Sequence, residues 1–165
     1  MSYDWRKFVR RIPVNSSPKS IYEAWTTQQG LESWFLRLAE FKSADGTIRS
    51  RNKPIEAGDS YKWLWYGYND DVKEENKILL VNGWDTIRFA FSGTCTVTVH
   101  IKQEEGETIC ELTQEMPMDD EEKRQYYFVD CGNGWTFYLA NLKSILEGGI
   151  DLRNKNHKLK EVVSA

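Results

Sequence analysis

The segment Thr94-Cys-Thr-Val-Thr-Val-His-Ile-Lys-Gln103 decides the fold class, because its apolar and polar residues alternate without a break. Apolar side chains occupy every second position from Cys95 to Ile101, and threonine or histidine stands between them. A strict period of two places one set on each face of a β-strand. We therefore predict a strand at residues 94–103, in an antiparallel sheet with one buried face and one solvated face.

The alternation continues on both sides of this segment and predicts a meander of about seven strands. Asp45-Gly46 and the polar run Glu104–Glu107 have the composition of turns between strands. The inner faces of this sheet are rich in tryptophan, tyrosine and phenylalanine. The predicted strands cover residues 5–14, 36–42, 61–65, 73–82, 84–92, 94–103 and 108–116.

Two short helices are predicted between the first two strands. Ser17 is a suitable N-cap and Pro18 suits the first helical position, so a helix is expected over Pro18–Thr26. The spacing of Leu31 and Trp34 indicates a second short helix after it. Isolated helices of this length are only marginally stable, so packing against the rest of the protein must stabilise them.

The period changes to 3.6 after residue 117 and predicts one long C-terminal helix. Asp119 is the expected N-cap with Glu122 at the N3 position, and Gly148-Gly149 ends the helix. Gly132 and Gly134 stand in its middle, where they either let the helix approach the sheet or leave a void. The apolar stripe is Phe128, Cys131, Trp135, Tyr138, Leu139, Leu142, Ile145 and Leu146.

Charge and hydropathy exclude several classes of function. Lys and Arg number 22 against 25 Asp and Glu, so the basic excess expected of a nucleic-acid-binding protein is missing. No apolar run reaches about 18 residues, so no membrane span is expected, and Met1–Lys7 lacks an apolar signal core. We expect a cytoplasmic protein. The basic residues Arg153, Lys155, Lys158 and Lys160 are interpreted as a solvated tail.

The sequence carries no pattern typical of catalysis, metal binding or disulfide formation. Cys110 should face Ile101, six residues from Cys95, which is too far for a bridge, so buried thiols are expected. His100 falls on an outward strand position and His157 in the tail, and no metal or cofactor site is predicted. Asp130 is the single helix carboxylate placed for general acid or base chemistry.

These elements define an α+β fold in which a curved antiparallel sheet wraps around one long helix. Such wrapping rarely seals the interior completely, so a cavity is expected between the sheet and the helix. The inward residues either fill the core or line that cavity, and both readings stay open. The candidate ligand-binding residues are Tyr61, Trp63, Trp65, Phe89, Phe91, Leu112, Cys131, Trp135 and Tyr138.

An ordered set of motifs resembles the START-like, SRPBCC-type proteins. Within them it is most similar to the branch named for the activator of the 90-kDa heat-shock protein ATPase. The resemblance implies a helix-grip fold, with residues 1–165 as one START-like domain, a core at about 5–148 and a polar basic tail at 149–165. The motifs are Ile12–Thr26, Leu31-x-x-Trp34, Gly58-x-x-Tyr61, Ile87-x-Phe89, Val97-x-Val99, Thr108-x-Cys110-x-Leu112 and Gly134-Trp135-x-x-x-Leu139-x-x-Leu142.

The resemblance also implies a range of functions, since its members bind lipids, sterols, polyketides or other apolar molecules and a few are enzymes. We expect non-enzymatic binding of a small hydrophobic or aromatic ligand. A chaperone-assisting module, with a place in stress response, is the second possibility, and its contact would lie on the acidic loop Asp70–Glu75 or the basic tail. A cyclase-type enzyme that uses Asp130 is the third.

Overall fold

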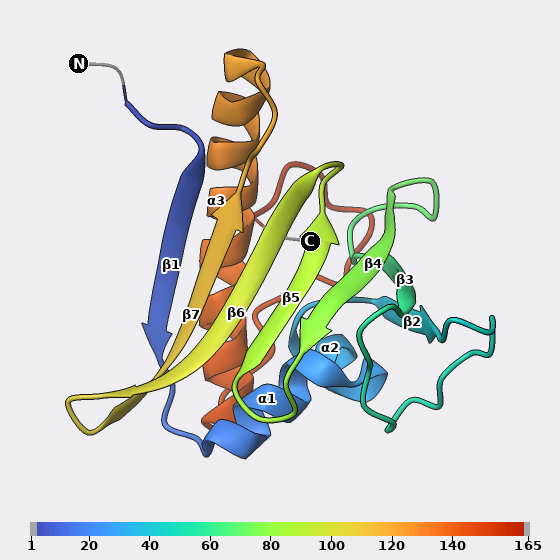
Figure 1. The fold of residues 1–165 in the computed structure, drawn as a ribbon, viewed down its shortest axis with the longest axis vertical. Coiled ribbons are helices and arrows are strands. Elements are labelled where there is room, and N and C mark those ends of the chain that lie inside the picture. The colour runs from blue at the N-terminus through green and yellow to red at the C-terminus, as the bar shows by residue number, and fades with distance from the viewer. Residues whose placement is uncertain (1–2, 164–165) are drawn as a thin grey trace.

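The computed structural model describes residues 3–163 as one sheet with three helices on one side (Figure 1). The first and last two residues of the predicted 1–165 domain lie outside the described residues. All seven strands join in one antiparallel sheet of order β1-β7-β6-β5-β4-β3-β2. The strands are β1 (Lys7–Pro13), β2 (Leu38–Lys42), β3 (Ser60–Leu64), β4 (Lys73–Val81), β5 (Thr86–Phe91), β6 (Cys95–Glu104) and β7 (Glu107–Glu115).

The alternating segment forms the central strand β6, as its period predicts. Its apolar residues from Cys95 to Ile101 are buried and the intervening residues are partly exposed. β6 pairs with β7 in the expected register, with Ile101 opposite Cys110. All three cysteines, Cys95, Cys110 and Cys131, are free and buried, so the prediction of buried thiols is confirmed.

Two short helices, α1 (Pro18–Thr26) and α2 (Gln28–Trp34), follow β1 as predicted. The Ser17 hydroxyl accepts a hydrogen bond from the backbone N–H of Ser20, and the Thr27 hydroxyl caps α2 in the same way. Trp25 and Trp34 are almost completely buried, and their rings meet at 4.6 Å. Tertiary packing therefore holds these helices, as their length requires.

The long helix α3 (Glu121–Leu146) begins one residue later than the sequence indicates. Asp120, not Asp119, is the N-cap, because its carboxylate accepts from the backbone N–H of Lys123. The guanidinium of Arg124 donates to the carbonyls of Met118 and Asp119, which holds that segment outside the helix. The predicted capping box with Glu122 at N3 is therefore wrong.

The end of α3 leads into a segment that packs back against the molecule. Gly148 adopts a φ of +80° and ends the helix, as predicted. Arg153 is buried, so its assignment to a solvated tail is wrong. Its guanidinium donates to the carbonyls of Glu32, Ser33 and Leu36 at the end of α2, and it pairs with Asp151. These carbonyls are the acceptors that a helix C-terminus leaves free.

The helix α3 lies closest to one edge of the sheet. Its backbone approaches β1 and α2, while the strands β3, β4 and β5 belong to the opposite wing of the sheet. Gly132 lies against the end of the Arg10 side chain from β1, since a Cβ there would lie 2.6 Å from Nη2 of Arg10 and the guanidinium would have to shift. Between the helix and the far wing the interior is wider, and aromatic rings occupy it.

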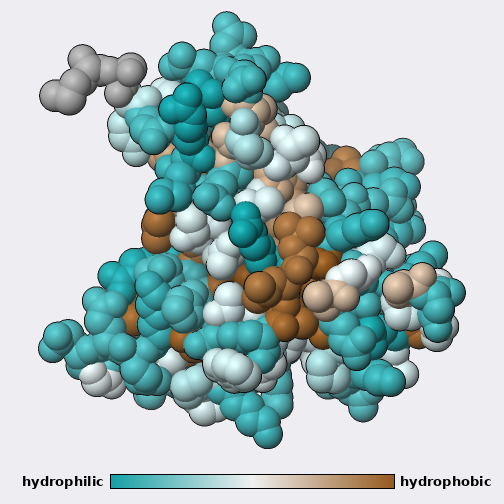
Figure 2. Space-filling model, in the orientation of Figure 1, coloured by the Kyte–Doolittle hydropathy of each residue, from teal (hydrophilic) through white to brown (hydrophobic). Residues whose placement is uncertain are grey.

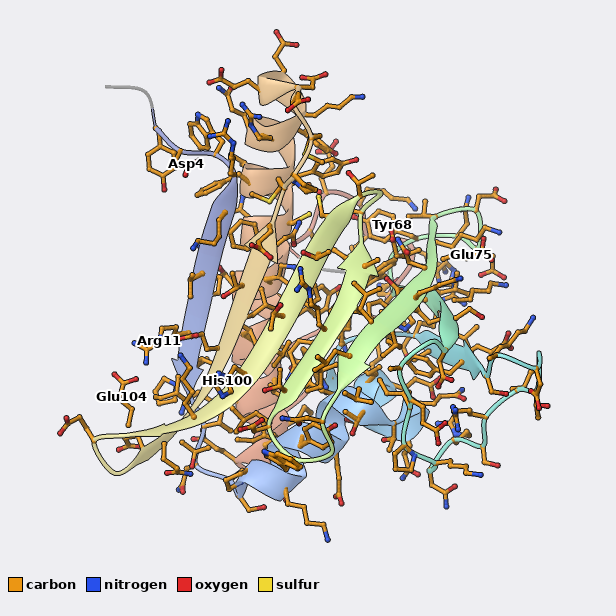
Figure 3. All side chains as sticks on the ribbon, in the orientation of Figure 1. Asp4, Arg11, Tyr68, Glu75, His100 and Glu104 are labelled. Atoms are coloured by element: carbon orange, nitrogen blue, oxygen red, sulfur yellow. The ribbon has the colours of Figure 1, made fainter. Side chains whose placement is uncertain are left out.

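The outer face of the sheet is mostly hydrophilic, with an apolar patch over β4 and β5 (Figure 2). Leu79 and Leu80 contribute exposed side chains there, at the point where β4 carries a bulge. The outer ion pair of Arg11 with Glu104 lies at the far end of the β6–β7 hairpin (Figure 3). Within residues 3–163 no helix combines the length and apolarity needed to cross a membrane.

Candidate binding cleft

An open cleft of about 610 Å³ separates α3 from the wing formed by β3, β4 and β5. Its volume lies within the range of about 300–1,000 Å³ that is usual for small-molecule sites. The loop between β3 and β4 supplies Tyr68 and Val72, and Tyr68 lies beside the start of β4 (Figure 3). The walls are Phe35, Trp65, Tyr68, Val72, Lys73, Glu74, Phe91, Ser92, Tyr126, Asp130, Cys131, Asn133, Gly134, Trp135, Tyr138 and Val163.

The deep wall of the cleft is a connected set of aromatic rings. Phe35 contacts Trp65 at 5.9 Å, Trp135 at 5.0 Å and Tyr138 at 4.8 Å between ring centroids. Phe91 closes the circuit, at 5.2 Å from Trp135 and 6.5 Å from Trp65. Rings held on several sides keep their orientation, so this wall is preformed for contact with a flat or apolar group.

Gly134 opens the cleft on the helix side. A Cβ at this position would meet no atom within 4 Å, in contrast to Gly132 two residues earlier. The sequence left two roles open for these glycines, close packing or open space. Gly132 lies against Arg10 and fits the first role, and Gly134 has open space beside it and fits the second. A helical glycine costs roughly 1 kcal/mol relative to alanine. No packing contact explains Gly134, but room for a ligand would.

The other end of the cleft is polar. The Glu74 Oε1 atom accepts hydrogen bonds from the backbone N–H of Ser92 at 2.9 Å and from Nδ2 of Asn76 at 3.3 Å. Ser92 Oγ lies 3.7 Å from the Cys131 sulfur. Burial raises the pKa of Glu74, and the bonds from Asn76 and Ser92 oppose that effect. The carboxylate is thus held in place at the base of the cleft.

A buried hydrogen bond orients the ring of Trp135. Its Nε1 donates to Oε1 of Gln114 at 2.8 Å, and both side chains are shielded from solvent. Gln114 also lies against Cys95 and Cys131 and lowers the pKa of both thiols, but burial dominates. The pKa of Cys95 is raised to about 11, so this thiol stays protonated and unreactive at neutral pH.

The structure brings five of the nine sequence-predicted residues to the cleft. Trp65, Phe91, Cys131, Trp135 and Tyr138 line it. The other four do not reach it, because they pack in the core beneath: Tyr61, Trp63, Phe89 and Leu112.

The core position of Tyr61 shows why these four residues are separated from the cleft. Its ring stacks on Trp63 at 3.9 Å, and its hydroxyl donates to the carbonyl of Ala90. Burial raises the pKa of Tyr61 far above its ordinary value. Its polar end is thus satisfied inside the protein and is not directed at the cleft.

The candidates for catalysis are scattered. Asp130 is exposed and lines the cleft, whereas His100 lies on the outer face of the sheet with Asp85 at 3.6 Å. Within residues 3–163 no three His, Cys, Asp or Glu side chains are grouped as a metal would require. Among the wall residues that the structure describes, Glu74 and Asp130 are the two that carry carboxylates.

Sequence reasoning missed Glu74, Tyr68 and Phe35 as cleft residues. Glu74 falls in the predicted strand 73–82, which β4 matches from Lys73, but it was considered only as part of the acidic surface run Asp70–Glu75. The parity of the buried Ile78 places Glu74 on the inner face, so the alternation did contain this signal. Tyr68 and Phe35 lie outside regular strands and helices, where no period could assign them a face.

A seven-stranded curved sheet around a C-terminal helix, with two short helices after the first strand, defines the class of START-like helix-grip proteins. The family model described as "Activator of Hsp90 ATPase homolog 1-like protein" matches residues 15–147. The chain belongs to this family, as the ordered motifs predict. No match was found among curated proteins.

Solved structures share this fold at low sequence identity. Protein SSP2350 of Staphylococcus saprophyticus superposes with a TM-score of 0.67 at 19% identity, over 89% of this chain and 96% of that one. The Aha1 dimer of Colwellia psychrerythraea gives 0.62 at 20% identity, over 87% and 97%. Protein BH1534 of Bacillus halodurans gives 0.62 at 17% identity, over 85% and 96%. Each similarity establishes the fold alone.

Proposed function

We propose that this protein binds a small apolar or aromatic molecule, such as a lipid-like or flat aromatic compound, in the cleft between α3 and the β3–β5 wing. The aromatic wall would supply affinity through burial, at about 25 cal/mol per Å² of apolar surface. Within residues 3–163 no arrangement of nucleophile, base and acid accompanies it, so we propose binding without turnover. We also retain the expectation of a cytoplasmic location.

The observation that carries this proposal is the empty space at Gly134. A Cβ at Gly134 would meet no atom within 4 Å. If the protein needed no open space here, a larger residue would improve helix propensity and packing without a clash. Here the space continues into a cleft whose wall includes Trp65, Phe91 and Trp135. Apolar walls around a few polar groups are the usual composition of ligand sites.

The test is a titration with apolar and aromatic compounds, followed by tryptophan fluorescence and by the melting temperature. We expect a binder to change the fluorescence, because Trp65 and Trp135 line the cleft. It should also raise the melting temperature by mass action. Replacement of Gly134 by leucine should fill the cleft and remove both responses.

Gly134→Ala is the matched control for the leucine variant. Both substitutions restore helix propensity, but a single methyl group leaves most of the space. Binding that survives in the alanine variant and is lost in the leucine variant supports the cleft as the site. The proposal fails if a broad library leaves fluorescence and melting temperature unchanged, or if Gly134→Leu binds as the wild type does.

A second candidate is a protein-interaction module that assists a chaperone in the stress response, and the family match favours it. Its contact surface would be the exposed part of the loop Asp70–Glu75 or the tail beyond Arg153. In that loop, Asp70 pairs with Arg37 and Lys73 pairs with Glu75. Stimulation of a chaperone ATPase, with its loss on removal of residues 154–165, would support this candidate over ligand binding.

A further inference from the structure

The charged groups in the wall of the cleft are unbalanced. Among the described wall residues, Glu74 and Asp130 are acidic and Lys73 is the one basic side chain. The ammonium group of Lys73 lies 3.1 Å from Oε2 of Glu75, which is not a wall residue, so its charge is already compensated. The cleft therefore presents two carboxylates without a matching cation from its own wall.

Both carboxylates lie in the wall of the cleft near Cys131. Glu74 accepts from the N–H of Ser92, whose hydroxyl lies 3.7 Å from the sulfur of Cys131, and Asp130 is the neighbour of Cys131 in α3. The pKa of Cys131 is raised first by burial, and the charges of Asp130 and Glu74 raise it further. The thiol of Cys131 therefore interacts with both negative charges.

Glu74 retains a free acceptor. Its Oε1 atom receives the bonds from Ser92 and Asn76, while Oε2 takes part in none of the hydrogen bonds or ion pairs among residues 3–163. Glu74 is partly buried, so the attraction between Oε2 and an approaching positive group would be less screened than on an open surface. A ligand with a positive group would supply a counter-charge.

We propose, resting on the function proposed above, that the cleft selects cationic ligands: a primary amine or quaternary ammonium group on an apolar or aromatic body. The cationic head would lie beside Glu74 and Asp130, and the body would lie on the wall of Phe91, Trp135 and Trp65. Aromatic faces attract cations through their quadrupoles, so the wall favours the same charge as the carboxylates. A ligand with a carboxylate, such as a fatty acid, is repelled at this end.

The experiment compares three probes that share one ring system and differ in the charge of the substituent. These are naphthalen-2-ylmethylamine as the cation, naphthalen-2-ylmethanol as the neutral probe and 2-naphthoate as the anion, each measured by isothermal titration calorimetry at pH 7. We expect the cation to bind at least about tenfold more tightly than the alcohol, and the anion to bind more weakly than the alcohol. A tenfold difference corresponds to about 1.4 kcal/mol.

Charge-neutralising variants locate the selectivity. Glu74→Gln keeps an acceptor for Ser92 and Asn76, and Asp130→Asn changes an exposed side chain, so both should fold. We expect each to reduce cation binding several-fold, and the double variant to lose most of the preference for the cation over the alcohol, with only the attraction of the aromatic wall remaining. Glu107→Gln, in the distant β6–β7 turn, removes the same charge and should change nothing.

The outcomes separate this proposal from the one on which it rests. If the alcohol binds as tightly as the cation, the cleft is a binding site and the cation selectivity is overturned. A preference for the cation that Glu107→Gln reduces as much as the double variant does would also overturn it, because net charge alone would then explain the result. If none of the probes binds and the wider library also fails, both proposals fall together.

Discussion

The two ends of α3 face different interiors, although both are lined by aromatic rings. At its C-terminal half, the closed end, α1 and α2 cover the helix, and Trp25, Trp34 and Leu142 are almost fully buried. Between Tyr126 and Tyr138, the open end, the helix borders the cleft, and Trp65 stays partly exposed. Aromatic content alone therefore does not decide whether an interior is filled.

What seals the closed end is a set of polar side chains that satisfy backbone groups. Trp34 Nε1 donates to the carbonyl of Ala24 at 3.0 Å, and Asn141 Nδ2 donates to the carbonyl of Trp34 at 2.7 Å. Asn141 Oδ1 accepts from the N–H of Leu152, which draws the segment after α3 over this end. Arg153 completes the cover at the end of α2.

Among residues 3–163 the open end has no comparable cover. The Nε1 atom of Trp135 has its hydrogen-bond partner in Gln114. The preceding residue is Gly134, where a Cβ would meet no atom within 4 Å. Of the segment after Arg153, Val163 reaches the wall of the cleft and is itself largely exposed. Buried polar groups need partners. The difference shows that the segment after α3, held by Asn141 and Arg153, contributes as much as the aromatic rings to where this interior closes.

The largest effect on the free energy of unfolding should come from replacing one tryptophan by alanine at each end of α3. Trp34→Ala should destabilise the protein by about 3–5 kcal/mol, because it removes a completely buried ring from the closed end. Trp65→Ala should cost at most about 2 kcal/mol, because part of this ring already contacts solvent. Urea denaturation measures both. Equal losses would contradict the division into a closed and an open end.

The next effect concerns the cover of the closed end. Arg153→Met should cost about 3 kcal/mol, because it removes one partner of a buried ion pair and leaves carbonyls at the end of α2 unpaired. In the wild type, burial acts to raise the pKa of Asp151, but hydrogen bonds from Arg153 and Lys155 outweigh it and hold the pKa well below its usual range.

The depressed pKa of Asp151 makes the sign of the pH effect definite. The ionised carboxylate of Asp151 stabilises the folded state at pH values above its pKa in the unfolded chain, which is about 3.9. This stabilisation is lost as the pH falls toward the lower pKa of Asp151 in the folded protein. Acidification below about pH 4 should therefore destabilise the wild type more than Arg153→Met. Denaturation curves at pH 7, 4 and 2.5 test this, and parallel losses in both proteins would count against the pair.

A smaller effect should separate the two glycines of α3. Gly134→Ala should stabilise the protein by about 1 kcal/mol, since the new methyl group meets nothing and the helix propensity improves. Gly132→Ala should gain less, because its methyl group must displace Arg10, which donates to Thr136 at 3.0 Å. Thermal unfolding of both variants gives the comparison, and the reverse order would show that the open end is packed.

The smallest effect is the pH dependence of the open end. The raised pKa of Glu74 contributes stability below the unfolded value of about 4.3, and this stability is lost as the pH rises through the folded value. Glu74→Gln should therefore lose less stability than the wild type between pH 4 and 7. The thiols and phenols that interact with Glu74 also have raised pKa values and stay neutral in this range: Tyr61, Cys95, Tyr127 and Cys131.

Most of the fold could be predicted because its signals are local and periodic. The alternation at residues 94–103 and the Ser17-Pro18 start of α1 both appear in the structure at the expected positions. The N-cap of α3 was misplaced because two aspartates stand side by side, and only the contacts of Arg124 decide between them. Arg153 was misplaced because a basic residue in a polar segment gives no sign of distant carbonyls.

The site could be predicted only in part. Period and parity identified Phe91 and Trp135 as inward-facing, but they assigned Trp63 and Phe89 to the same set. Parity states which face a side chain occupies, not how far the opposing helix is from it. The distance depends on how α3 leans toward β1, which is set by contacts between segments more than a hundred residues apart.

From its residues alone, the chain determined the order of strands and helices, the inward faces of the sheet and the family to which it belongs. Tertiary structure alone decided where the interior closes and where it opens, and that Glu74 and Asp130 both line the opening. The physical reason is that side-chain periodicity is a property of each segment, while a cleft is the space that remains after several segments have packed.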